Sequence, residues 1–147
     1  MSIRSLTISL THVSGPIGRP PKQNLSLFLS GFLMDDLHAS GSVTLQSGTM
    51  TEFPVGPMDF EGLCRTAEAA GLVDRVPNVA GVQDTSNRWS LVLLHVSHEK
   101  GSHNLSLSLL SSGFRGPDAP GLQKFFDRLL TIAGVKDEII RHDLTGF

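Results

Sequence analysis

Leucine alternates with serine or threonine in three separate stretches of this chain, and no other feature constrains the fold as much. Alternation with a period of two places apolar side chains on one face of a β-strand and polar side chains on the other. The three stretches predict strands at residues 3–13, 24–30 and 105–109. The run from Trp89 to His98 is almost continuously apolar, which predicts a further strand that is covered on both faces.

In two other stretches the period changes to that of a helix. From Asp59 to Gly71, and again from Gly116 to Gly134, apolar residues recur three or four positions apart, as on one face of an amphipathic helix. Asp59 and Asp118 stand near the two starts, where a carboxylate can accept hydrogen bonds from unpaired backbone amides. Gly71 and Gly134 stand where each apolar stripe stops. The sequence therefore predicts two helices with aspartate caps.

Shorter elements connect these strands and helices. An alternating stretch on either side of a Ser-Gly turn predicts a hairpin within residues 35–55. Residues 15–21 and 75–88 are rich in glycine, proline or other turn formers and predict a loop and a linker. Ile139 and Ile140 indicate a short final element that closes the core.

The order of the elements indicates two related β-β-α units, at residues 3–74 and 88–135. Each unit has a strand that ends in His-Val-Ser, at His12 and His95, then an Asn-Leu-Ser-Leu strand, then Gly-Pro before a helix. The hairpin would be an insertion in the first unit. Any amphipathic chain with the order strand, strand, helix can show similar blocks without a duplication. The sequence therefore leaves the duplication open.

These elements predict one α+β domain over residues 1–147, with an antiparallel sheet and two helices on one face. A chain of 147 residues can bury a core of its own without disulfides. The first strand carries no charge from Ser5 to Thr11, and we expect it to lie at an edge of the sheet. Such an edge accepts a partner strand, which predicts a homodimer or the addition of a strand from another protein.

Charge and composition argue against several classes of partner. The formal net charge is −2, and the densest basic feature is only Arg19 with Lys22, so we expect no nucleic-acid binding. No apolar run approaches the roughly 20 residues of a membrane helix, and the N-terminal stretch is not that of a signal peptide. The single cysteine, Cys64, cannot form an internal disulfide. The sequence therefore predicts a cytoplasmic protein without membrane or nucleic-acid partners.

Three histidines, His95, His98 and His103, are the candidate metal ligands because imidazole is the commonest ligand and all three lie in one predicted hairpin. The strand period places His95 and His98 on opposite faces, so at most two of the three converge without a bulge. A further ligand would have to be Glu99, His12 or His142. This set supports an alternative interpretation as a small metal-dependent or histidine-using enzyme.

Other catalytic interpretations have less support. Cys64 shares a helical stripe with Phe60 and Ala67, an apolar setting that raises a thiol pKa, so we expect an inert core cysteine. Gly-x-Ser-x-Gly, P-loop and Gly-x-Gly-x-x-Gly motifs are absent from the sequence. The acidic pairs Asp35-Asp36 and Asp137-Glu138 are expected to be solvated.

The sequence thus predicts no catalytic residues and no cofactor. The leading hypothesis is a non-enzymatic protein-binding or regulatory module, of the inhibitor or immunity type, that acts through a surface or a sheet edge. The hypothesis is based on the combination of a compact fold with the absence of catalytic motifs from the sequence.

Overall fold

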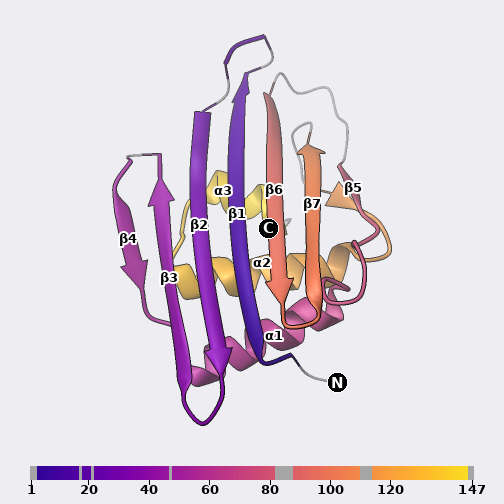
Figure 1. Ribbon diagram of the computed structural model, residues 1–147. Coiled ribbons are helices and arrows are strands. Elements are labelled where there is room, and N and C mark those ends of the chain that lie inside the picture. Colours follow the sequence, from indigo (N-terminus) through magenta and orange to yellow (C-terminus); the bar gives the residue numbers. More distant parts are fainter. Residues whose placement is uncertain are drawn as a thin grey trace.

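In the described part of the chain, six strands form one antiparallel sheet and two short strands form a separate pair (Figure 1). The structure is a computed structural model that describes residues 3–16, 18–20, 22–46, 48–81, 88–109 and 114–145. The strands of the large sheet are β1 (Ser5–Pro16), β2 (Lys22–Leu33), β3 (Leu37–Leu45), β4 (Met50–Phe53), β6 (Arg88–His98) and β7 (Gly101–Leu109). Their order is β4-β3-β2-β1-β6-β7, and β5 (Ala80–Gly81) pairs with β8 (Phe114–Arg115).

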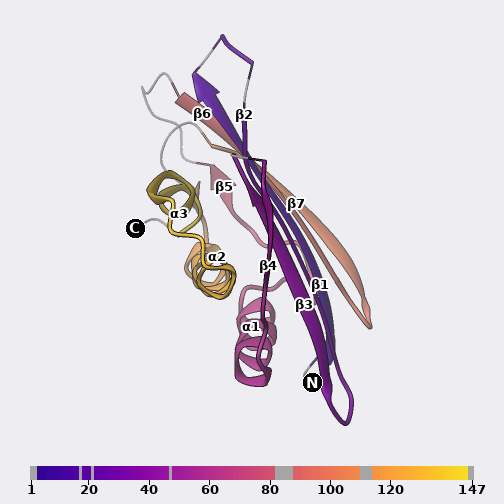
Figure 2. The same cartoon turned by 90° about the vertical axis from the view of Figure 1, so that its left-hand side faces the viewer.

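Helices cover one face of the large sheet, and no described element covers the other (Figure 2). The described helices are α1 (Pro57–Ala69), α2 (Ala119–Ala133) and α3 (Glu138–Thr145). The predicted α+β fold with an antiparallel sheet is confirmed. The sequence predicts two helices, whereas the last element is a third helix in which Ile140 is buried and Ile139 is exposed. None of the described helices is long and apolar enough to span a membrane.

The core lies between the sheet and the helices, and the alternation of the strands supplies its sheet side. The buried side chains of the central strands are Leu6, Ile8 and Leu10 of β1, Leu25, Leu27 and Leu29 of β2, and Val92, Leu94 and Val96 of β6. On the helix side, the largest fully buried side chains are Phe60 of α1 and Phe125 and Phe126 of α2. Gly31 of β2 is required here, because a Cβ atom at this position would overlap the Phe60 ring.

The first strand is central in the sheet, and the prediction that it is an edge is wrong. β1 pairs with β2 from Ser5 to Ser14 and with β6 from Leu6 to Pro16. Its backbone donors and acceptors are therefore used on both sides, and no partner strand can add to it. The edges of the large sheet are β4 and β7.

β6 is a strand, as predicted, but it is not covered on both faces. Val92, Leu94 and Val96 are buried beneath the helices, whereas Leu93 is 43% exposed. The helices pack on one face only, so the leucines at odd-numbered positions of this apolar run remain on the uncovered face. A continuous apolar run is therefore compatible with a half-covered strand.

The helix ends differ in part from the predicted caps. Gly56 is the N-cap of α1, with Pro57 at the first helical position, so Asp59 does not cap the helix. Asp118 occupies the N-cap of α2 but makes no side-chain capping bond. Gly134 ends α2 with a left-handed conformation, φ 73°, which confirms the predicted stop.

Two hairpins, β1-β2 and β6-β7, lie side by side in the order β2-β1-β6-β7, and α1 packs on α2. This arrangement matches the predicted order of the two units. The His-Val-Ser blocks, however, do not occupy equivalent places, because His12 is buried on the helix side and His95 lies on the uncovered face. The duplication of units 3–74 and 88–135 stays a prediction.

Candidate functional site

The predicted hairpin histidines separate onto the two faces of the sheet. His98 and His103 face the helices, with ring centroids 6.0 Å apart, and their Nε2 atoms lie 3.0 and 2.9 Å from the carbonyl oxygen of Val73. His95 points to the uncovered face, where its Nδ1 atom is 2.5 Å from Oδ1 of Asn104. The structure thus brings together two of the three candidate ligands.

Hydrogen bonding limits what His98 and His103 can ligate. A ring nitrogen that meets a carbonyl oxygen carries a proton and donates it, so neither Nε2 atom has a lone pair to offer a metal. Nδ1 of His98 accepts from the backbone amide of Lys100 at 3.1 Å. Over the described residues, no group of three or more His, Cys, Asp and Glu side chains is placed to hold a metal ion.

The residues considered as a further ligand lie elsewhere. Desolvation, the largest single effect, raises the pKa of the Glu99 carboxyl, but the hydrogen bonds that it accepts from the backbone amides of Arg4 and Ser5 outweigh this and leave the pKa lowered. These bonds hold the chain just before and at the start of β1. His142 is exposed on α3. His12 is fully buried.

His12 belongs to a buried polar cluster that the sequence interpretation missed. Its Nε2 atom is 2.8 Å from Oδ2 of Asp143 in α3, and both side chains are inaccessible to solvent. Its Nδ1 atom accepts from Nδ2 of Asn24 at 3.0 Å, so Nε2 carries the proton that Asp143 accepts. In a Ser-His-Asp arrangement the second ring nitrogen would face a serine hydroxyl, whereas here Nδ1 faces the Asn24 amide. The cluster therefore has a structural role and holds α3 against β1.

The one signal for this cluster in the sequence was the position of His12. It follows Leu6, Ile8 and Leu10 at the same period and therefore belongs to the buried face. Nothing local identifies Asp143, which is 131 residues away in the chain.

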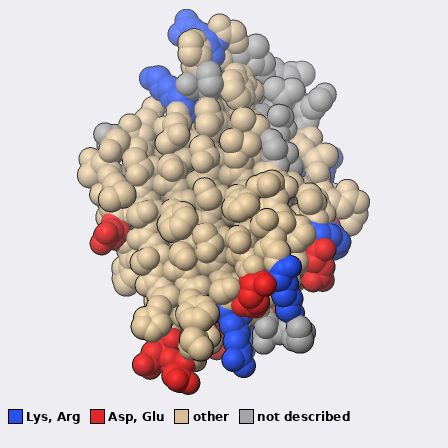
Figure 3. Space-filling view, in the orientation of Figure 1, with Lys and Arg blue, Asp and Glu red and all other residues tan. Residues whose placement is uncertain are grey.

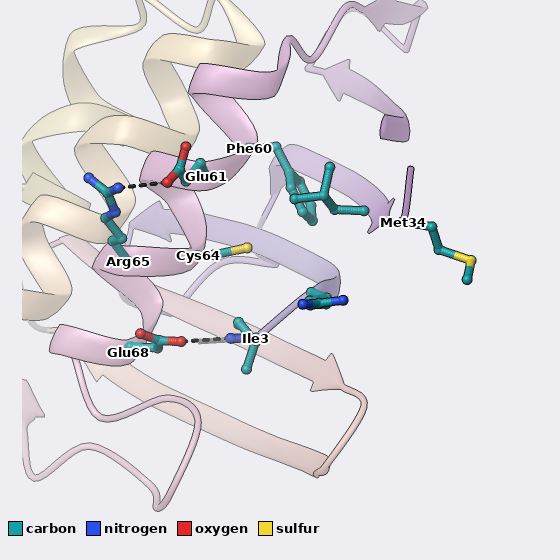
Figure 4. A pocket seen from close by; sticks show the side chains of 9 residues that line it. Ile3, Met34, Phe60, Glu61, Cys64, Arg65 and Glu68 are labelled. Carbon is teal, nitrogen blue, oxygen red and sulfur yellow. Dashed lines mark hydrogen bonds and ion pairs between the residues drawn. The ribbon is translucent and has the colours of Figure 1, made fainter. Parts of the chain in front are cut away.

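Cys64 lines a pocket of about 480 Å³ between α1, the start of β1 and the turn from β2 to β3. Figure 4 shows Cys64 directed toward this pocket from α1, between Phe60 and Ile3. Burial, followed by the charges of Glu68, Glu99 and Glu61, raises the pKa of the Cys64 thiol to about 12.

The charged side chains around this pocket do not activate the thiol. The Glu68 carboxylate accepts the amide of Ile3 at 2.8 Å, and Glu61 pairs with Arg65 at 2.6 Å. A thiol of this pKa is protonated at neutral pH, whereas the thiolate is the nucleophile. The arrangement therefore offers an apolar hollow beside an unreactive thiol.

The acidic pairs take ordinary roles in the structure. Asp35 and Asp36 are exposed in the turn between β2 and β3. Asp137 accepts the backbone amide of Ile140 at 3.0 Å, which caps α3, and Glu138 is exposed in the first turn of that helix. These contacts give neither pair a catalytic environment.

The uncovered side of the large sheet, called the open face below, is the most distinctive surface. It consists of the side chains that alternate with the buried ones. They are Ser5, Thr7, Ser9 and Thr11 of β1, Ser26, Phe28, Ser30 and Phe32 of β2, His38, Ser40, Ser42 and Thr44 of β3, Leu91, Leu93, His95 and Ser97 of β6, and Ser102 and Asn104 of β7. None of these residues is Asp, Glu, Lys or Arg, but Glu52 of β4 pairs with Ser42 and so lies on the same face at its rim, where Figure 3 shows charged side chains.

The open face combines protruding aromatic rings with a hollow. Phe28 and Phe32 of β2 are 47% and 45% exposed. On the other side of β1, a hollow of about 480 Å³ is bounded on the open face by Ser9, Thr11, Leu93, His95 and Asn104. Small hydroxyl side chains of β1 separate the two features, because Ser9 pairs with Phe28 on one side and with His95 on the other.

Comparisons of this chain with protein-family models, with curated proteins and with solved structures find no match.

Proposed function

We propose that this chain is a non-enzymatic protein-binding module, of the regulatory or inhibitory type, and that it acts through the open face. The observation that supports this proposal is a sheet face that exposes Phe28, Phe32 and Leu93 and whose central residues, from Ser42 of β3 to Asn104 of β7, include no Asp, Glu, Lys or Arg, while Glu52 lies at its β4 edge. Aromatic enrichment and depletion of charge distinguish the centres of protein interfaces from ordinary surface. Exposed apolar patches rimmed by polar residues mark the same kind of site.

The sheet edges suit this role less well than the open face. β4 is four residues long and carries Glu52, and short strands with charges are the usual devices that prevent a further strand from adding. At the other edge, β5 lies against β7. A partner is therefore expected to dock on the side chains of the face.

Cytoplasmic location is part of the proposal, supported by a single, buried cysteine.

The alternative is a small metal-dependent or histidine-using enzyme built on the hairpin from His95 to His103, and the approach of the His98 and His103 rings is the observation that supports it. Elemental analysis of the purified protein separates the two proposals. Stoichiometric zinc or nickel that is lost in a His98→Ala variant would favour the enzyme. Protein that purifies without stoichiometric metal would argue against the metal-dependent enzyme.

Site-specific photo-cross-linking in cells tests the proposal directly. A photoreactive residue at Ser40, exposed on the open face, should form a covalent adduct with a second polypeptide, and the additional change Phe28→Lys should abolish the adduct. The matched control is the same residue at Lys124, which is exposed on α2. Equal yields at the two positions would contradict a binding role for the open face.

A further inference from the structure

The open face is complementary to itself along one row of residues across the sheet. Phe28 pairs with Ser9, Ser9 pairs with His95, and His95 pairs with Asn104, so all four lie at one level along the strands. Phe28 protrudes at one end of this row. The hollow bounded by Ser9, His95 and Asn104 occupies the other end.

We infer that the occupant of the open face is a second copy of this chain, with Phe28 of each copy seated in the hollow of the other. This inference rests on the proposed function and names the partner. The hollow, at about 480 Å³, is large enough for a phenyl ring. Leu93 supplies an apolar wall for it, and the amide of Asn104 borders it.

A twofold axis that runs along β1, in the plane between two facing sheets, produces this contact. Rotation about it places β2 of one copy over β6 of the other, because β2 and β6 are the two neighbours of β1. The rotation leaves the level along the strands unchanged. Phe28 of each copy therefore arrives over the hollow of its partner, and both contacts form at once, as an interface between identical patches requires.

The charge distribution favours a second copy over an unrelated partner. In a twofold interface every charged group near the axis meets the same charge from the other copy, and like charges brought together in this way cost affinity. Among the described residues that line the open face beside β1 there is no such group, and Glu52, which lies on this face opposite Ser42, is on β4, three strands from the axis. A face adapted to a charged partner would instead carry the complementary sign.

The size of the face is sufficient for a stable dimer. Five strands about 4.8 Å apart, each contributing about eight residues at about 3.3 Å, give a face of roughly 600 Å² per copy. Two such faces bury about 1,200 Å² when each is treated as flat, and protruding side chains add to this area. Specific interfaces begin at about this value and commonly reach about 1,600 Å².

Sedimentation equilibrium of the purified full chain tests the inference. We expect a dimer, and we expect Phe28→Lys to raise its dissociation constant roughly thirtyfold or more, because it replaces a central aromatic anchor with an unpaired charge. Met58→Lys, at an equally apolar and 85% exposed position on α1, is the control and should leave the dimer intact. An unchanged circular dichroism spectrum shows that each variant is folded.

Cross-linking with a short bismaleimide tests the direction of the axis. Ser30 and Ser97 flank Thr7 on β2 and β6, so the axis places Ser30 of one copy over Ser97 of the other. A mixture of Ser30→Cys and Ser97→Cys chains should cross-link, whereas each variant alone should do so poorly. Cys64 is buried and does not compete.

Two results would overturn the inference. One is a chain that stays monomeric at high concentration. That result would exclude the dimer, and the cross-linking at Ser40 in cells would then decide separately whether the open face binds another protein. The other is a dimer that withstands Phe28→Lys and dissociates on Met58→Lys, which would place self-association on the helical side.

Discussion

The two faces of the large sheet are made from alternate residues of the same strands, yet they have opposite chemistry. On β1, Leu6, Ile8 and Leu10 are fully buried beneath the helices, while Thr7 and Ser9 between them lie on the open face. The covered face is aliphatic and provides the core. The open face presents hydroxyl groups with a few exposed rings, which keeps it compatible with water and still able to bind.

The largest expected difference concerns the reactivity of Cys64, which lies beneath the covered face. We expect the native thiol to react with a disulfide reagent roughly a thousandfold more slowly than the thiol of the unfolded chain. The pKa rises from 9.0 to about 12, which removes most of the thiolate at any neutral or mildly alkaline pH. Stopped-flow labelling with and without denaturant measures this. Native labelling within tenfold of the unfolded rate would reopen the case for a nucleophile.

The same substitution on the two faces should have very different effects on stability. Phe125→Ala removes a fully buried ring from the helix layer, and we expect it to lower the free energy of unfolding by about 3–5 kcal/mol. Phe28→Ala removes a ring that is 47% exposed and should cost about 1 kcal/mol in the monomer. Urea denaturation at low protein concentration measures both. Equal losses would mean that the open face is covered in the native state.

The smallest expected effect tests whether ion pairs help to hold the helix layer. Asp118 accepts hydrogen bonds from the Arg75 guanidinium and from the amide of Asn78, and these contacts lower the pKa of its carboxyl to about 2. A carboxyl whose pKa is lowered on folding stabilises the protein above the unfolded value, near 3.8, and loses this contribution as pH falls through the folded value.

We therefore expect Arg75→Ala to unfold at a slightly lower temperature than the native chain above pH 4, with the difference vanishing toward pH 2. The control repeats the comparison in chains that also carry Asp118→Asn. This change removes the titrating group, so the melting temperatures with and without Arg75→Ala should then differ by an amount that does not depend on pH. Thermal melts at intervals between pH 2 and pH 5 provide the measurement. A difference that grows toward low pH would contradict the assignment.

Local periodicity was enough to predict most strands and both long helices, because the alternation of Leu with Ser or Thr is contained within each segment. It could not predict the strand order. The uncharged stretch from Ser5 to Thr11 suits an edge by its own composition, and only the pairing of β1 with β6 places it at the centre. For the same reason, the apolar run of β6 did not reveal which of its faces lacks a cover.

The candidate site was still harder to predict, because its parts come from distant segments. Phe28, Ser9, His95 and Asn104 form one row only through the registers of three strand pairs. The pairing of His12 with Asp143 likewise depends on how α3 packs beneath the sheet. The position of His12 in an apolar stripe indicated its burial, but no local pattern indicated its partner.

The central pairing of β1 with β6 also has a consequence for how the chain is made. Leu6 pairs with His98, so one side of β1 has no partner until most of the chain has left the ribosome. The β1-β2 hairpin is complete at Leu33, and at about 5–20 residues per second the stretch from there to His98 takes roughly 3–13 s. During that time the β1-β2 hairpin displays a free strand side with no charge from Ser5 to Thr11 to repel another nascent chain. Protection by a chaperone is therefore most needed before residue 98 is translated.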